Sequence, residues 1–447
     1  MAGQNPRLQI RGTFALENVG TTELKFIDIV FPDEKVFGRR NLRVRMDGRD
    51  APLSQLPEEY RQEAPHTLRL ALDPLWEQKQ KRTLDIEYTL SSPEDSGERI
   101  TIADNRFHLG FRGWFSVLRP PKHVLAPFPK RPDKTIVSIR VPQDFLVLAR
   151  GAPVGRKQQG GDVEHRFLLG NDDLAPYVVA GRYSESTSRG NSDSAIFWTL
   201  HPLEEDPTAT GQRLAAAWNL LQTDFGPIDK NIRVPRVVEC PGLHAHIADE
   251  EGPAAAPFPG GVLVNSEALA LGIGSEVFIG KVTHALAHNW FGDELYFNSA
   301  AAIGMGEGLP EYATIVIDEA RTGAGARQQR ISRLLGEYDE ALRQAVEKPL
   351  GLTSLLDPLE QRRVAMAKAP LFFAALEDAH GEAPVRAGLN RLVTLLRGEE
   401  VGYDDLRAAL EESTGRNLAE TFRIWLYGKG IPAEFSARYK SANETQP

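Results

Sequence analysis

The chain has 447 residues, 41% of them hydrophobic and 25% charged, which is typical of a globular protein and excludes a disordered chain, a coiled coil or a collagen-like rod. Its 52 basic and 61 acidic residues give a formal net charge of −9. This balance argues against a nucleic-acid binder, because such proteins concentrate an excess of Lys and Arg.

Up to about residue 195, hydrophobic residues alternate with polar ones. The alternation is regular in the segments 8–16, 68–72 and 84–90. A period of two places every second side chain on one face, as in half-buried strands of an antiparallel sheet. Turn-forming residues at 158–162 separate two such strands. We therefore predict an N-terminal antiparallel β domain that spans residues 1–200.

After residue 200 the hydrophobic period changes to 3.6, which predicts helices with one buried face. The period recurs in the segments 214–225, 331–342, 385–396 and 418–426. Gly226 is placed to end the first helix. The run Gly261–Val264 predicts a short strand. The fold class is therefore α+β, with a mainly helical domain over residues 201–447 and a boundary between residues 195 and 207.

Two features bear on the cellular compartment. Cys240 is the single cysteine, so an intramolecular disulfide is excluded and no oxidising compartment is indicated. The residues from Met1 to Arg7 contain no apolar run, and no stretch of 18 apolar residues occurs in the chain. We therefore expect a cytoplasmic protein without a membrane span.

One pair of histidines has the spacing of metal ligands. His284 and His288 lie in a predicted helix that begins after Ser275, a residue type favoured at the N-cap. A separation of four places both imidazoles on one helix face, within reach of a single Zn²⁺. Glu307 follows His288 after eighteen residues and opens another predicted helix, so its carboxylate can return to the same face.

Chance is a poor explanation for this triplet. Ten histidines in 447 residues give roughly 0.2 pairs at this spacing, and a chosen position holds a carboxylate with a probability of about 0.14. The product is roughly 0.03. Three protein ligands would leave the fourth position of a zinc ion open to water, as in catalytic zinc sites.

The stretch from Lys281 to Gly292 resembles the zinc-binding helix of the gluzincin aminopeptidases, the family of aminopeptidase N and leukotriene hydrolase. Their zinc-binding pattern begins with H-E-x-x-H. Eighteen residues separate the second His from a Glu that lies within N-E-G, and W-F-G follows the second His. Segments 114–121, 141–142 and 179–183 resemble the end of that family's N-terminal β domain, and segment 422–432 resembles the close of its catalytic domain.

The resemblance implies a saddle-like β domain followed by a thermolysin-like metallopeptidase domain. It implies one Zn²⁺ held by His284, His288 and Glu307, and a peptide substrate cleaved by zinc-activated water. The acidic charge balance, rather than the resemblance, predicts no nucleic-acid partner. The oligomeric state stays open.

The sequence departs from the family at the general base. The family's Glu in H-E-x-x-H deprotonates the zinc-bound water, and here that position is Ala285. The loss of an acid–base group typically lowers a rate by roughly 10²- to 10⁴-fold. Glu311, one helical turn after Glu307, is a weaker alternative as a substitute base.

A second departure concerns substrate binding. The aminopeptidases carry G-x-M-E-N upstream of the zinc helix, and its Glu holds the free α-amino group of the substrate. The matching region, residues 257–264, contains no carboxylate. We expect the edge strand that pairs with an extended peptide to survive, with Gly260, Gly261 and Val262 as substrate-binding residues.

A third departure concerns the family's oxyanion-stabilising tyrosine, whose best match is Met366. Tyr312, Tyr338 and Tyr403 remain possible substitutes, although each fits a packed aromatic as well. Two functions follow from the three departures. The first is an aminopeptidase-type zinc metallopeptidase with impaired activity. The alternative is an inactive pseudopeptidase that binds a peptide or protein partner through the same cleft. A metal-free scaffold explains the ligand spacing least well.

Overall fold

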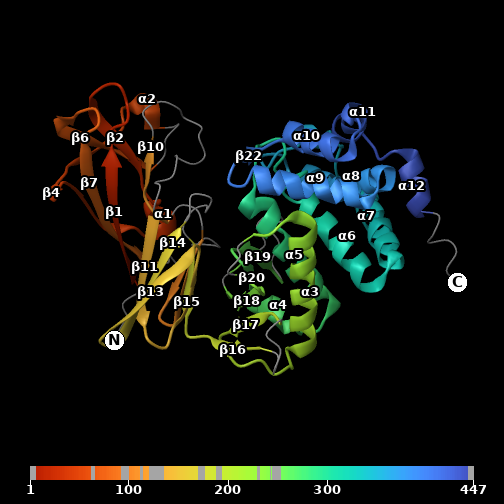
Figure 1. Cartoon of the computed structure of the whole chain (residues 1–447), viewed down its shortest axis with the longest axis horizontal. Coiled ribbons are helices and arrows are strands. Elements are labelled where there is room, and N and C mark those ends of the chain that lie inside the picture. Colours follow the sequence, from red (N-terminus) through yellow and green to blue (C-terminus); the bar gives the residue numbers. More distant parts are fainter. Residues whose placement is uncertain are drawn as a thin grey trace. The chain divides into compact units, whose positions relative to one another are not determined.

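The computed structural model describes residues 7–61, 66–91, 100–110, 114–119, 135–169, 177–187, 194–228, 232–241, 243 and 253–440. The chain divides into two compact units, Met1–Arg182 and Tyr183–Pro447 (Figure 1). The sequence predicts a boundary at residue 200, and the structure divides earlier. The reason is that strands β16 (Ser184–Ser186) and β17 (Ile196–Thr199) pair within the sheet of the second unit.

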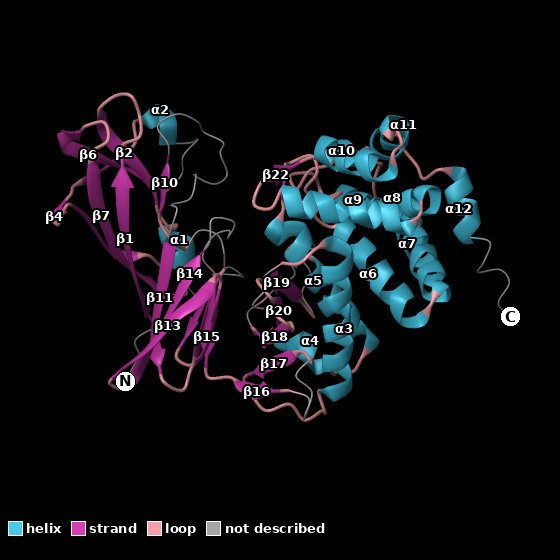
Figure 2. Ribbon diagram, viewed as in Figure 1, coloured by secondary structure: helices cyan, strands magenta, loops and turns pink. Residues whose placement is uncertain are grey.

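The first unit is built from antiparallel sheets with two short helices (Figure 2). Across the first sheet, the described strands are β1 (Arg7–Glu17), β7 (Lys81–Ser91), β3 (Arg40–Met46) and β4 (Arg49–Asp50). Across the second, they are β10 (Val117–Arg119), β2 (Leu24–Val30), β6 (Thr67–Trp76) and β5 (Leu53–Gln55). The third sheet has the order β11 (Thr135–Pro142), β14 (Asp162–Leu169) and β13 (Ala152–Gln159), and the fourth has the order β12 (Leu146–Ala149), β15 (Val178–Gly181), β9 (Arg106–Leu109) and β8 (Ile100–Ala103). The helices are α1 (Glu34–Phe37) and α2 (Glu58–Arg61).

The core of the first unit follows the predicted alternation. Every second side chain of β7, from Leu84 through Ile86 and Tyr88 to Leu90, is at most 2% exposed. The intervening residues face away, because successive side chains of a strand point to opposite sides. The Tyr88 hydroxyl donates to the Trp114 carbonyl oxygen at 2.8 Å, so its polar end is satisfied inside the core. The prediction of half-buried antiparallel strands is confirmed.

The second unit combines a five-stranded sheet with helices (Figure 2). The sheet order is β16, β17, β18 (Arg236–Glu239), β20 (Gly261–Val264) and β19 (Ala255–Phe258). Its α-helices are α3 (Thr208–Phe225), α4 (Ser266–Ala270), α5 (Glu276–Ala287), α6 (Gly308–Thr322), α7 (Ala324–Gln344), α8 (Leu359–His380), α9 (Glu382–Leu395), α10 (Tyr403–Thr414), α11 (Ala419–Phe422) and α12 (Ala433–Lys440). Two π-helical turns lie at Asn289–Glu294 and Arg423–Tyr427, and a 3-10 turn lies at Leu350–Leu352. The strands β21 (Tyr296–Phe297) and β22 (Glu400–Val401) pair with each other.

The helices of the second unit bury the predicted hydrophobic faces. In α3, Leu214, Trp218, Leu221 and Phe225 are all fully buried. The helix ends at Gly226, whose φ of 93° suits glycine best. The α+β class, with an antiparallel β domain followed by a mainly helical domain, is therefore confirmed.

One expectation about the sheet is wrong. The sequence analysis places an edge strand at Gly261–Val264, but β20 lies between β18, its parallel neighbour, and β19, its antiparallel neighbour. The turn at Pro259 and Gly260 reverses the chain and brings Ala255–Phe258 alongside as an extra strand. The edge of the sheet is therefore β19.

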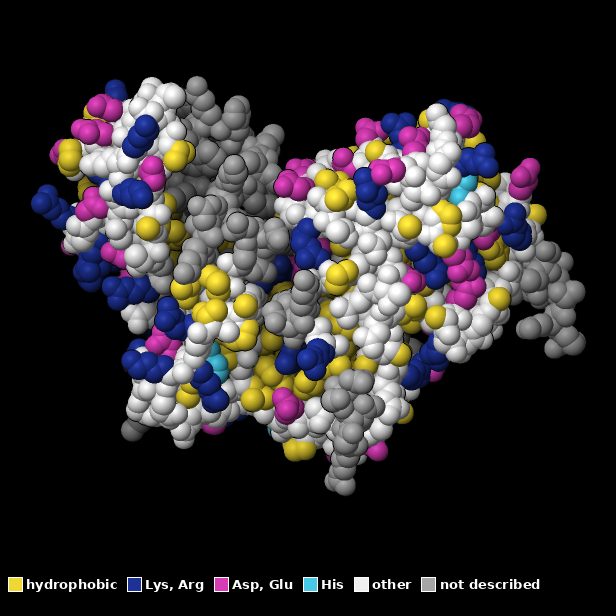
Figure 3. Space-filling view, viewed as in Figure 1, with side chains coloured by type: hydrophobic (Ala, Val, Ile, Leu, Met, Phe, Trp, Pro, Cys, Tyr) yellow, Lys and Arg dark blue, Asp and Glu magenta, His cyan; other side chains and the backbone are white. Residues whose placement is uncertain are grey.

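Charged side chains of both signs are visible on the second unit. Figure 3 shows basic and acidic side chains interspersed over the second unit. Among the described residues, no helix is both long and apolar enough to cross a membrane.

A buried carboxylate connects four helices of the second unit. Glu377 on α8 accepts hydrogen bonds from Arg327 Nη1 on α7 at 2.6 Å and from Arg386 Nε on α9 at 2.9 Å. The Tyr312 hydroxyl on α6 donates to the same carboxylate. Burial, together with the negative charge of Glu377, raises the pKa of Tyr312, so this phenol stays protonated and remains a donor.

We expect Glu377→Ala to destabilise the second unit by about 3–5 kcal/mol, because two arginines would lose the carboxylate that compensates them in a buried site. The matched control is Glu382→Ala, since Glu382 also pairs with Arg386, at 3.1 Å, but is 57% exposed. It should cost less than about 0.5 kcal/mol. Urea unfolding followed by tryptophan fluorescence measures both, and equal effects would contradict the argument.

Candidate metal centre

Helix α5 positions the two predicted histidine ligands. The Ser275 hydroxyl accepts a hydrogen bond from the Phe278 amide at 3.1 Å and so caps the helix, as predicted. His284 lies in the last turn, and His288 is the C-cap residue. Their Nε2 atoms face each other at 3.2 Å. One helical turn therefore separates two imidazoles that converge on a single point.

The chain leaves the helix immediately after His288, and the break orients that ring. Phe291 and Gly292 have non-helical backbone angles, and the φ of 141° at Gly292 requires glycine. This turn points the Phe291 carbonyl oxygen back toward His288 Nδ1, at 3.2 Å. If Nδ1 carries the proton and donates it to that carbonyl, Nε2 keeps its lone pair for a ligand.

Glu307 closes the group from the start of the next long helix. It is the residue before α6, and its Oε2 lies 3.5 Å from His284 Nε2 and 3.7 Å from His288 Nε2. The following Gly308 allows α6 to approach α8 closely, because a Cβ there would lie 2.5 Å from Ala369 Cβ. The eighteen-residue spacing thus returns a carboxylate to the histidine face.

The donor set fits a tetrahedral zinc ion. Ligand atoms about 2.0–2.1 Å from zinc in tetrahedral geometry lie about 3.3 Å from one another. The three observed separations are 3.2, 3.5 and 3.7 Å. All three potential ligand atoms lie within 4.8 Å of one another, in the one group of this kind among the described residues. With both Nδ1 atoms hydrogen-bonded elsewhere, the facing Nε2 lone pairs repel unless a cation or a proton lies between them.

Glu311 lies behind His284, on the side away from this point. Its Oε2 is 3.1 Å from His284 Nδ1. Its other oxygen accepts from Arg330 Nη2 at 2.7 Å and from Arg333 Nη2 at 3.3 Å. A carboxylate that binds the outer nitrogen of a ligand histidine fixes its tautomer and orientation. This placement favours an orienting role for Glu311 over the alternative of a substitute base.

The charges of His284 and Glu307 depend on each other. Burial favours neutral His284, but hydrogen bonds to Glu307 and Glu311 outweigh it and raise the pKa of this imidazole to about 9. Burial likewise favours protonated Glu307, yet the neighbouring His288 and hydrogen bonds from both histidines lower its pKa to about 2. A proton therefore occupies the group in the absence of a metal, and a metal ion must displace it.

The positions expected to supply acid–base and oxyanion groups are apolar. Ala285 is 2% exposed and packs in the main core of the second unit, so only a methyl group stands there. Met366 is half-buried against the same core. Of the tyrosines considered as substitutes, Tyr312 donates to Glu377, and the hydroxyl of the buried Tyr403 lies next to Gly304. Tyr338 is likewise buried, and its pKa is raised by burial and by Glu347.

The expected substrate-binding residues serve a structural contact. The Gly260 amide donates to Asn289 Oδ1 at 2.9 Å, and Asn289 Nδ2 donates to the Gly261 carbonyl oxygen at 3.1 Å. Val262 is fully buried in β20. The Asn289 side chain thus connects the β19–β20 turn to the end of the zinc helix.

Sequence reasoning missed Asn289 and Arg330. Asn289 adjoins His288, and a polar residue between His288 and the aromatic pair Trp290-Phe291 was the available signal. Arg330 lies on α7, and no fixed spacing relates it to His284.

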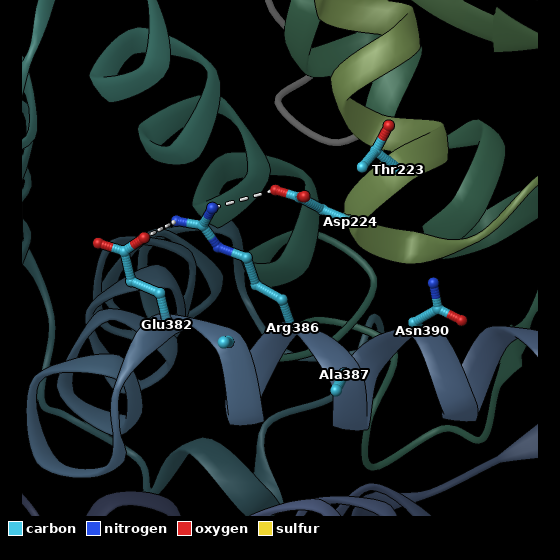
Figure 4. Close-up of a pocket in the computed structure, with 7 residues that line it drawn as sticks. Thr223, Asp224, Glu382, Arg386, Ala387 and Asn390 are labelled. Atoms are coloured by element: carbon cyan, nitrogen blue, oxygen red, sulfur yellow. Dashed lines mark hydrogen bonds and ion pairs between the residues drawn. The ribbon is translucent and has the colours of Figure 1, made fainter.

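A separate pocket of about 510 Å³ lies between the end of α3 and α9 (Figure 4). Its charged residue Arg386 is already satisfied, because it reaches Asp224 at 3.1 Å, Glu382 at 3.1 Å and Glu377 at 2.9 Å. None of the pocket's lining residues belongs to the His–His–Glu group. We assign it no role.

The sequence matches no protein-family model and no curated protein. Solved structures share its fold. An M1 zinc metallopeptidase from Deinococcus radiodurans, crystallised as a Glu-to-Ala mutant with a Tyr-Ser-Ala substrate, aligns over 96% of this chain and 91% of its own, with 17% identity and a TM-score of 0.64. The same metallopeptidase without the mutation gives a TM-score of 0.63, at 17% identity and the same coverage.

Legionella pneumophila aminopeptidase A, in complex with aspartic acid, aligns over 94% of this chain and 47% of its own, with 15% identity and a TM-score of 0.65. The chain therefore has the two-domain fold of M1 zinc metallopeptidases.

We expect the purified protein to bind one Zn²⁺ and to lose it in His288→Ala, because two ligands seldom hold zinc. His201→Ala is the matched control, since His201 is exposed and outside the group. Elemental analysis measures the metal, and a chelator should lower the melting temperature of the wild type but not of His288→Ala. Equal zinc in both variants would contradict the assignment.

Glu311→Gln should weaken zinc binding by roughly 10- to 100-fold, because the amide cannot orient His284 as a carboxylate does. Asp318→Asn is the control: Asp318 also pairs with Arg330, at 3.3 Å, but has no contact with His284 among its ion pairs. Competition with a chromophoric chelator gives both affinities. An equal loss of zinc affinity in the two variants would show that the loss arises from the ion pairs of Arg330 rather than from the hydrogen bond between Glu311 and His284.

Proposed function

We propose that this chain is a zinc-binding member of the gluzincin aminopeptidase family, with impaired peptide hydrolysis. One Zn²⁺ would be held by His284, His288 and Glu307. The observation that carries the proposal is the convergence of these three ligand atoms within 4.8 Å. The fold shared with M1 zinc metallopeptidases supports it.

The chain's own residues prepare the ligand nitrogens. Zinc in such a site lowers the pKa of a bound water toward about 7 and polarises a carbonyl group. With a metal bound, Glu311 and the Phe291 carbonyl oxygen would accept the Nδ1 protons of the two histidines, and both Nε2 lone pairs would then face the metal. Arg330 neutralises Glu311, which limits the net negative charge beside the cation.

Among the described residues, neither of the two positions considered for a general base is available to accept the proton of an attacking water. Ala285 presents a buried methyl group, and Glu311 faces the outer nitrogen of His284 between two arginines. Met366 offers no hydroxyl to stabilise an oxyanion. Losing the base alone lowers a rate by roughly 10²- to 10⁴-fold, so we propose slow turnover.

A peptide is the ligand we propose. One structural neighbour was crystallised with Tyr-Ser-Ala and another with aspartic acid. The edge strand β19 could pair with an extended chain through main-chain hydrogen bonds. Its sequence, Ala255–Phe258, carries no carboxylate, so selection for a free α-amino group is not part of the proposal.

A second candidate function is that of a pseudopeptidase, which binds a peptide or protein without cleaving it. Two positions favour it, because Ala285 and Met366 have both lost polar groups while the metal ligands and their orienting partners are retained. The two candidates share the metal and the ligand, and they differ only in turnover.

Restoring the carboxylate separates the candidates. We expect Ala285→Glu to raise peptidase activity by roughly 10²- to 10⁴-fold over the wild type at equal zinc content. Ala285→Gln is the matched control, because it has the same size but no basic carboxylate. Activity is measured with aminopeptidase and endopeptidase substrates of several sequences.

The wild type itself decides between slow enzyme and pseudopeptidase. Slow hydrolysis that His288→Ala abolishes supports the impaired enzyme, and hydrolysis absent until Ala285→Glu supports the pseudopeptidase. Vigorous wild-type hydrolysis that Ala285→Glu does not increase would refute the impairment.

A further inference from the structure

Strand β1 is a long strand at the edge of its sheet. It pairs with β7 without interruption from Arg7 opposite Ser91 to Glu17 opposite Lys81. It stands at the end of the strand order of its sheet, and no described strand pairs with its other side. An unpaired edge of this kind presents a row of backbone N–H and C=O groups to another strand.

The other sheet edges of the described residues are shorter or contain proline. Nine of them, β4, β5, β8, β10, β12, β16, β19, β21 and β22, have four residues or fewer. The edges β11 and β13 have eight residues each and contain Pro142 and Pro153, and β13 also shifts register after Pro153. Short edges and prolines are common protections against unwanted pairing. The eleven residues of β1 have neither protection.

The side chains of β1 are complementary to those of an antiparallel copy of itself. With the two copies centred on Gly12, residues whose numbers are equally far from 12 face each other. Arg7 then faces Glu17, so both ends carry opposite charges, and the four large apolar residues of β1 face one another. The facing pairs are Arg7 with Glu17, Leu8 with Leu16, Gln9 with Ala15, Ile10 with Phe14, and Arg11 with Thr13.

The apolar residues of β1 have surface left to bury. Leu8, Ile10, Phe14 and Leu16 pack against the core of the first unit, yet all four are only half-buried. The Phe14 ring lies over Gly12, since a Cβ there would be 3.1 Å from it. A second strand alongside would cover the open flank of these side chains with the matching side chains of its own copy.

We propose that β1 is a homodimer interface, in which two copies of the chain pair antiparallel about a two-fold axis at Gly12. The two four-stranded sheets then form one continuous sheet, with the same surface of each copy in contact. The occupant is a second copy because the charge and apolar patterns of β1 match themselves. The proposal is independent of zinc and of peptidase activity.

A charge-swap experiment on the full chain tests the register. Sedimentation velocity from about 1 to about 100 μM should show the wild type shifting toward twice the 49.4 kDa of one chain. Arg7→Glu and Glu17→Arg change exposed residues. In the symmetric dimer each substitution creates two contacts between like charges, and each should weaken dimerisation about tenfold. The double variant, R7E with E17R, should restore the wild-type dissociation constant.

The control is Arg49→Glu, which reverses a charge on β4 at the opposite edge of the same sheet and should leave dimerisation unchanged. A cross-link supplies a second measurement: the double variant Gln9→Cys and Ala15→Cys should form a disulfide-linked dimer, and Gln9→Cys alone should not. A monomer throughout the concentration range would overturn the proposal. So would a dimer insensitive to both single reversals, or one that the double variant fails to restore.

Discussion

The close approach of two imidazole nitrogens constrains everything around them. At 3.2 Å, the Nε2 atoms of His284 and His288 repel unless a positive charge lies between them. The surrounding structure maintains that arrangement: the Phe291 carbonyl oxygen and Glu311 hold the outer nitrogens, and Glu307 adds a third ligand atom. The glycines beside these residues permit the sharp turn and the close helix contact that the arrangement needs.

Among the described residues, three potential ligands of a cation converge, and the two positions expected to supply acid–base and oxyanion groups are apolar. Glu311 is fixed by Arg330 and Arg333, so the network that orients His284 is complete. By contrast, the side chains at Ala285 and Met366 pack as ordinary apolar residues. The buried Glu377 network joins four helices of the second unit.

Sequence periodicity predicted most of the fold, because burial of one face produces the pattern in both strands and helices. Spacing likewise predicted that His284, His288 and Glu307 would converge, since helix geometry fixes the first pair. It failed at β20, where a two-residue turn at Pro259 and Gly260 added an unforeseen edge strand. It also could not place Glu311 or Arg330, because their partners come from packing between helices that are separated in sequence by loops.

The Asn289 side chain has a mechanical consequence. Its oxygen accepts from the Gly260 amide, and its nitrogen donates to the carbonyl oxygens of Gly261 and Leu286. Both polar atoms of this amide are hydrogen-bonded, so one side chain joins the β19–β20 hairpin to the end of α5. An extended chain aligned on β19 would therefore have its backbone at a set offset from the imidazole nitrogens, whatever side chains it carried.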